Sequence, residues 1–179
     1  MKQKKKTFEQ HLYHEIEDYE KAEEYLDSAL PLIGLVVMYF NGLERFLDSI
    51  ICQIFTDRSD STGLIVLHKM SYATKVDLFK RFSDDLHFNC DIKIESYSDL
   101  LINLRESGRL RNLVVHADWE NTDDDGYTYI NLRISGHGME QEYMQFSEKS
   151  LQEIIGLILK TKTDLDDYWG ERNDKLYRR

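Results

Sequence analysis

The residues from Pro31 to Phe55, PLIGLVVMYFNGLERFLDSIICQIF, predict the central helix of the fold. Apolar residues recur here on more than one side of a helix, as in a helix that other elements surround. They are Leu32, Leu35, Val36, Tyr39, Leu43, Phe46, Leu47, Ile50 and Ile54. Pro31 is the only proline of the chain. It suits a first helical turn, where its missing N–H would have no partner in any case. We therefore expect a new helix to begin at Pro31.

Helical spacing of apolar residues marks further segments on both sides of this helix. We expect a charged helix over residues 8–29, another over 74–87, and another from about 95 or 98 to 116. Residues 56–62 are polar and predict a loop. A turn at 121–126 and alternating residues at 127–134 and 139–146 predict a β-hairpin. Ser147 is expected to cap a last helix that runs to about Trp169.

These elements predict a mostly α fold, a helical bundle with a β-hairpin before the last long helix. The length of 179 residues suits a single domain over residues 1–179. About seven residues at the N-terminus and about ten at the C-terminus are expected to fray.

Composition indicates an acidic, soluble protein. The formal net charge is −10, so any nucleic-acid binding requires a local basic patch. Cys52 and Cys90 form no CxxC pair and predict reduced thiols in the cytoplasm. The most apolar run, residues 29–40, is shorter than the roughly 20 residues that span a bilayer. We therefore expect a cytoplasmic protein with no membrane partner.

The string Arg111-Asn112-Leu113-Val114-Val115-His116 places an arginine and a histidine in an apolar helical segment. A helical projection puts Asn112 and His116 on one polar strip, together with Arg105 and Arg109. Arg111 projects with the apolar residues Leu100, Leu104, Val114 and Val115. A charge in that position requires a partner, for which Glu44 and Asp48 are the best candidates. Because Arg111 and His116 point roughly 140° apart, one straight helix does not make them converge.

Such residues can act on a phosphodiester. A histidine can be a general base or acid, and an arginine can stabilise charge that develops on phosphate. RNA carries its own nucleophile, the 2′-hydroxyl, so this chemistry requires no metal. No metal-ligand spacing and no phosphate-loop or dinucleotide motif occurs, and we expect neither metal nor cofactor. The alternative is that Arg111 belongs to a buried polar network in a helical interaction protein.

The chain resembles the HEPN-domain family. The resemblance rests on residues 111–116 and is supported by residues 41–47, the helix containing residues 75–82, and the hairpin before the final helix. It implies a helical bundle, a homodimer with the motif in a cleft at the dimer interface, and a metal-independent endoribonuclease used as a toxin or in antiviral defence. It also implies a 2′,3′-cyclic phosphate product. Arg111 and His116 would be the catalytic pair, Asn112 a supporting residue and Glu44 a weaker acidic candidate.

The resemblance implies two partners, and it leaves open whether the protein is an active enzyme. RNA would be the substrate, and an antitoxin protein would be a further partner. Some family toxins carry a tyrosine two residues after the histidine, where an antitoxin modifies it. That position is Asp118 here, so this mode of control is not supported. Other relatives are inert and bind a nucleotide or a protein, which is the alternative function.

Overall fold

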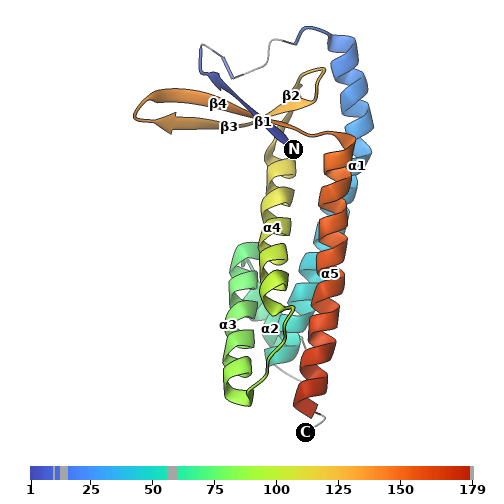
Figure 1. The fold of residues 1–179 in the computed structure, drawn as a ribbon, viewed down its shortest axis with the longest axis vertical. Helices are drawn as coiled ribbons and strands as arrows, with labels where there is room; N and C mark the ends of the chain where they lie inside the picture. Colours follow the sequence, from blue (N-terminus) through green and yellow to red (C-terminus); the bar gives the residue numbers. More distant parts are fainter. Residues whose placement is uncertain (10, 13–15, 56–59, 178–179) are drawn as a thin grey trace. The chain divides into compact units, whose positions relative to one another are not determined.

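The computed structural model describes residues 1–9, 11–12, 16–55 and 60–177. It is mostly helical with one small antiparallel sheet, which confirms the predicted mostly α class. The elements are β1 (Lys2–Thr7), α1 (Tyr19–Phe55), α2 (Ser61–Leu67), α3 (Tyr72–Cys90), α4 (Tyr97–His116), β2 (Asp118–Thr122), β3 (Tyr127–Ser135), β4 (Gly138–Gln145) and α5 (Glu148–Tyr177) (Figure 1).

The chain divides into two compact units. Unit 1 contains residues 1–37 and 110–155, and unit 2 contains residues 38–109 and 156–179. Helices α1, α4 and α5 each contribute residues to both units. The motif Arg111–His116 therefore belongs to unit 1, whereas Glu44 belongs to unit 2.

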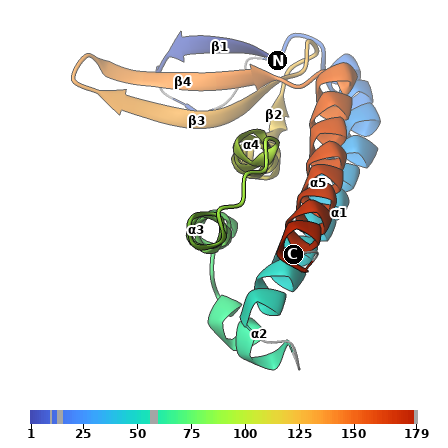
Figure 2. The ribbon, with the colours of Figure 1, turned by 60° about the horizontal axis from the view of Figure 1, so that its bottom comes forward.

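The sheet of unit 1 has the order β1-β4-β3-β2 (Figure 2). The predicted hairpin is confirmed: β3 and β4 pair from Tyr127 and Gln145 to Ser135 and Gly138 at the tip. The predicted turn is confirmed over its last four residues, where the amides of Gly126 and Tyr127 both donate to Asp123. Asn121 lies in β2 instead.

The first residues, which we expected to fray, form the edge strand β1. Lys2 pairs with Gln145 and Thr7 with Glu140, so the whole of β1 pairs with residues 140–145 of β4. The sequence of β1, KQKKKT, contains no apolar residue. It therefore lacks the alternation by which a strand is recognised. Backbone hydrogen bonds to β4 hold β1 in place. No hydrophobic pattern in the sequence of β1 predicts this pairing.

Pro31 does not begin a helix but lies inside α1, so the predicted break is wrong. Helix α1 begins at Tyr19, where the Asp18 carboxylate accepts a hydrogen bond from the Lys21 amide at 3.1 Å. A proline inside a helix costs about 3 kcal/mol. Ala29 and Val36, on either side of Pro31, are both buried. Burial on both sides offsets this cost and keeps the helix continuous.

Helix α1 is long and apolar enough to cross a membrane by length and composition. Its most apolar 18-residue window has a mean hydropathy of 1.5, and 22% of that window is buried. The core helices of soluble proteins meet the same criterion. Residues 29–40 alone are too short to span a bilayer, but helix α1 as a whole is long enough.

Helix α5 continues past Trp169, where we expected it to end, as far as Tyr177. Side chains in the last turns of α5 contact one another. The Arg172 guanidinium lies over the Trp169 ring, 4.3 Å from its centroid, and Lys175 pairs with Glu171 at 2.7 Å. At the other end, Ser147 caps α5 as predicted, accepting from the Ser150 amide at 3.2 Å.

The loop predicted at residues 56–62 lies partly outside the described residues, since 56–59 are not described. Helix α2 then begins at Ser61. Within unit 2, buried apolar residues of all four long helices form a common core. They are Leu43, Leu47, Ile50, Val76, Phe79, Leu100, Leu104, Leu165 and Tyr168.

Gly108 lets α4 approach α3 closely within unit 2. A Cβ at position 108 would lie 2.7 Å from Cδ1 of Tyr72, and the Tyr72 hydroxyl donates to the Leu104 carbonyl at 3.1 Å. We expect Gly108→Ala to lower the free energy of unfolding by about 1–2 kcal/mol, because steric overpacking outweighs the gain in helix propensity. Urea denaturation measures the change.

Gly156, in α5, is the matched control. No described atom lies within 4 Å of a Cβ built there. Gly156→Ala is expected to raise the free energy of unfolding by about 0.5–1 kcal/mol. Equal effects of the two substitutions would contradict the packing role of Gly108.

Candidate functional site

The motif residues lie on the last turns of α4, in unit 1. Val114 is fully buried, whereas Asn112 and His116 are exposed and Arg111 is half-buried. The predicted exposure of the Asn112 and His116 strip is thus confirmed. Val115, expected on the apolar face, is instead 36% exposed. One helix end therefore presents an imidazole and an amide outward.

Arg111 and Asn112 are joined by a hydrogen bond. Nη1 of Arg111 donates to Oδ1 of Asn112 at 3.0 Å. This contact joins the side chains of two neighbouring residues on α4. A guanidinium group is planar and has five N–H donors, a geometry that suits the oxygens of a phosphate or a carboxylate.

The end of α4 is fixed by Trp119 of β2. The indole Nε1 donates to the Val114 carbonyl at 2.8 Å, and the Trp119 ring packs on Phe146 with centroids 5.0 Å apart. Carbonyl groups of a last helical turn lack partners within the helix. Trp119 provides one and so holds the turn that carries His116 against the sheet.

Glu44 lies in a charge cluster of unit 2 that sequence reasoning missed. Nζ of Lys75 donates to Oε1 of Glu44 and to Oδ2 of Asp48, each at 2.8 Å. The Lys75 side chain is 9% exposed. Burial opposes its charge, but the hydrogen bonds that Lys75 donates to Asp48 and Glu44 outweigh burial and raise the pKa of Lys75. The two carboxylates proposed as partners of Arg111 thus share a buried lysine.

The arginines of the predicted basic strip that lie in unit 2 have acidic partners. Arg105 Nη2 lies 3.1 Å from Oδ1 of Asp77, and Arg109 donates to both carboxylate oxygens of Glu106 at 2.8 Å. Exposed pairs of this kind contribute little to stability. They do reduce the positive charge that this part of α4 offers to an anion.

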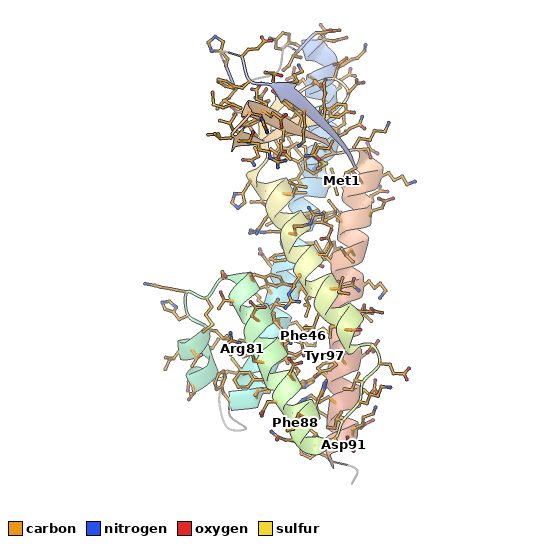
Figure 3. All side chains as sticks on the ribbon, turned by 60° about the vertical axis from the view of Figure 1, so that its left-hand side comes forward. Met1, Phe46, Arg81, Phe88, Asp91 and Tyr97 are labelled. Carbon is orange, nitrogen blue, oxygen red and sulfur yellow. The ribbon has the colours of Figure 1, made fainter. Side chains whose placement is uncertain are left out.

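A second polar cluster of unit 2 surrounds His87. The Tyr168 hydroxyl lies 3.1 Å from Nε2 of His87, and the ring of Tyr97, labelled in Figure 3, packs edge-on to the imidazole at 4.7 Å. The Tyr97 hydroxyl donates to Oδ1 of Asp84 at 2.8 Å. Aromatic packing and paired hydroxyls indicate a structural role for His87.

Burial lowers the pKa of His87 below 6.5, and Arg172 and Lys175 lower it further while Asp84 acts in the opposite direction. Below pH 6.5 the unfolded chain therefore binds more protons at this residue than the native protein. We expect the contribution of His87 to stability to be present above pH 6.5 and to be lost as the pH falls below it. Urea midpoints measured over a pH series should show a shallower acid loss in His87→Gln. Identical profiles would contradict this contribution.

Among the described residues, no three histidine, cysteine or acidic side chains come together in a way that could hold a metal ion. Cys52 and Cys90 are free thiols. Comparison of the chain with protein-family models, curated proteins and solved structures found no match.

Proposed function

We propose that the protein is a metal-independent endoribonuclease of the toxin or phage-defence type, with Arg111 and His116 as its catalytic pair. The observation that carries the proposal is the end of α4, where His116 is exposed and Arg111 and Asn112 are joined at 3.0 Å. The resemblance of residues 111–116 to the HEPN signature supports it. RNA is the proposed substrate and the cytoplasm the proposed location.

The reaction needs a base, a charge stabiliser and an acid. His116 takes the proton of the 2′-hydroxyl, and the 2′-oxygen then forms a bond to phosphorus. Arg111 stabilises the charge on the non-bridging oxygens. The bond to the 5′-oxygen breaks, and that oxygen takes a proton from an acid. The products are a 2′,3′-cyclic phosphate and a 5′-hydroxyl.

A homodimer would supply the second group. One helix separates Arg111 and His116 by roughly 140°, so a single motif does not surround one phosphate. Two motifs that meet across a two-fold axis offer two imidazoles, one as base and one as acid. Asn112 positions Arg111 in this proposal. Glu44 has the weakest support, because its carboxylate already accepts a hydrogen bond from Lys75.

The alternative is a non-enzymatic HEPN module that binds a nucleotide or a protein such as an antitoxin. The paired state of Arg105 and Arg109 favours a protein as the ligand, since carboxylates neutralise these arginines and leave less positive charge for RNA or a nucleotide. An inert module would bind an anion at the motif without cleaving it.

Cleavage of matched RNA and DNA strands tests the proposal. Purified protein is incubated in EDTA with labelled total RNA, with a labelled RNA oligonucleotide, and with the same oligonucleotide made entirely of 2′-deoxy residues. We expect the RNA to be cut and the deoxy strand to remain intact. Intact RNA in every case would favour the binding module, and a cut deoxy strand would contradict attack by the 2′-hydroxyl.

A further inference from the structure

The outer edge of β3 is only partly covered by β2. Strand β2 pairs with β3 through Asp118, which lies opposite Tyr129, and Thr122, which lies opposite Thr128. Residues 131–135 continue from there to the tip of the hairpin, and β4 is the one described strand that pairs with them. Figure 2 shows β3 and β4 extending beyond β2. We call residues 131–135 the open edge.

Backbone groups of the open edge point away from β4. On the far side of the hairpin, the Met139 carbonyl accepts a hydrogen bond from the Phe8 amide at 3.0 Å, so the backbone of Met139 does not bond to β3. Met139 lies directly opposite Ile134. In an antiparallel ladder, opposite residues exchange both backbone hydrogen bonds or neither, and the two kinds of pair alternate. Ile134, and Leu132 two positions earlier, therefore direct their N–H and C=O groups outward.

The open edge lacks the features that protect the other side of the sheet. Charged side chains, lysine above all, discourage an edge strand from pairing with further strands. Strand β1 has the sequence KQKKKT, with a lysine at four of its six positions. The open edge has the sequence NLRIS, which contains neither lysine nor proline. Its Ile134 side chain is 73% exposed. The open edge is therefore suited to pair with another strand.

Strand β2 limits the length of any strand that can pair with the open edge. Asp118 already lies opposite Tyr129, so an added strand has to end before that position. A second copy of the chain meets this condition, because its own β3 ends at Ser135, where the hairpin turns. If two copies lie antiparallel with Arg133 on the two-fold axis, Ser135 of each lies opposite Asn131 of the other. The turn of each copy then comes just before β2 of the other.

In this register the side chains of the two copies complement each other. Leu132 of each copy lies opposite Ile134 of the other, so apolar side chains adjoin on one face of the sheet. The outward N–H and C=O groups of these residues exchange the hydrogen bonds of an antiparallel ladder. Arg133 lies opposite its own equivalent, but Glu140 lies opposite it on β4 and the Glu142 carboxylate approaches it at 3.9 Å. The two arginines therefore meet with carboxylates beside them.

We propose that the open edge pairs with the open edge of a second copy and joins two sheets into one antiparallel sheet. A two-fold contact of this kind leaves neither open edge unpaired. The contact differs from the dimer proposed for catalysis and does not rest on the ribonuclease function. Tyr129, opposite the first residue of β2, lies roughly 13 Å along the strand from Arg133 on the axis. The two copies of His116 therefore do not share one phosphate across this axis.

A cysteine on the proposed axis tests the contact and its register. Arg133→Cys is introduced into protein with Cys90→Ser, which leaves the buried Cys52 as the other thiol. Opposite residues of this kind have Cα atoms about 4.5 Å apart, a distance that a disulfide spans. We expect mild oxidation to link Arg133→Cys into a dimer on non-reducing gels. Asn131→Cys, exposed on the same strand, is the control and should stay monomeric on the gel, because its equivalents lie roughly 13 Å apart. Linkage of the control as strong as that of Arg133→Cys, or no linkage of either, would overturn the proposal.

Sedimentation equilibrium tests the same contact without a new thiol. Each copy contributes one short strand, so the contact is small and the measurement uses high protein concentration. Ile134→Lys places a lysine on the open edge, as β1 has on its edge, and we expect the wild type to have roughly twice the mass of this variant. Thr7→Lys adds the same charge at an exposed position of β1 and should keep the wild-type mass. Circular dichroism checks that each variant folds. A folded Ile134→Lys variant with the wild-type mass would contradict the proposal.

Discussion

Replacing His116 by alanine is expected to slow RNA cleavage by about 10²–10⁴-fold, because the reaction loses its proton acceptor. The change should leave the fold intact, since His116 is exposed and is the last residue of α4. The measurement is the single-turnover rate constant on a labelled RNA at saturating protein. Thermal unfolding of the same preparations should coincide within about 2 °C, as expected for a surface substitution.

His137→Ala provides the matched control for this prediction. His137 is also exposed, but it lies in the turn between β3 and β4. The control is expected to cleave RNA at the wild-type rate. If His116→Ala cleaves as fast as the control, the imidazole at position 116 takes no part in the reaction and the assignment is wrong.

Replacing Lys75 by methionine is expected to destabilise the protein by roughly 3 kcal/mol. The substitution leaves the carboxylates of Glu44 and Asp48 facing each other without their shared cation. Oδ1 of Asp48 is already buried without a hydrogen-bond partner among the described residues. Urea denaturation followed by circular dichroism gives the free energy of unfolding.

Lys80→Met, on the same helix, is the control. Lys80 pairs with Asp84, but both side chains are more than 40% exposed, so the loss should be no more than about 1 kcal/mol. Combining Lys75→Met with Glu44→Gln and Asp48→Asn should restore part of the stability, because the uncompensated charges are removed. A loss at Lys75 no larger than the loss at Lys80 would show that the cluster is not a buried charge network.

The elements with strong periodicity were predictable from the sequence. Helix α4 and the hairpin of β3 and β4 lie within a few residues of their predicted bounds, because their patterns are local. Two features were not predictable in this way. The strand β1 has no apolar alternation and exists through pairing with β4. Helix α1 continues through Pro31 because residues on both sides of the proline are buried. Local helix propensity does not predict this burial.

The same distinction applies to the candidate site. The exposure of Asn112 and His116 followed from helical geometry, since both positions lie on one strip. The partner of Glu44 and Asp48 did not, because Lys75 is 27 to 31 positions away along the chain. The packing of α3 on α1 decides which lysine contacts the two carboxylates. Sequence spacing contains no information about that contact.

Analysis of the RNA ends that the protein produces tests the central claim most directly. A defined RNA is incubated with the wild-type protein in EDTA, and the fragments are analysed by mass spectrometry. The proposed attack by the 2′-hydroxyl predicts 2′,3′-cyclic phosphates on the upstream fragments and 5′-hydroxyls on the downstream fragments. Upstream fragments that end in a 3′-hydroxyl, with 5′-phosphates downstream, would contradict it, because they require attack by water with the 3′-oxygen as leaving group.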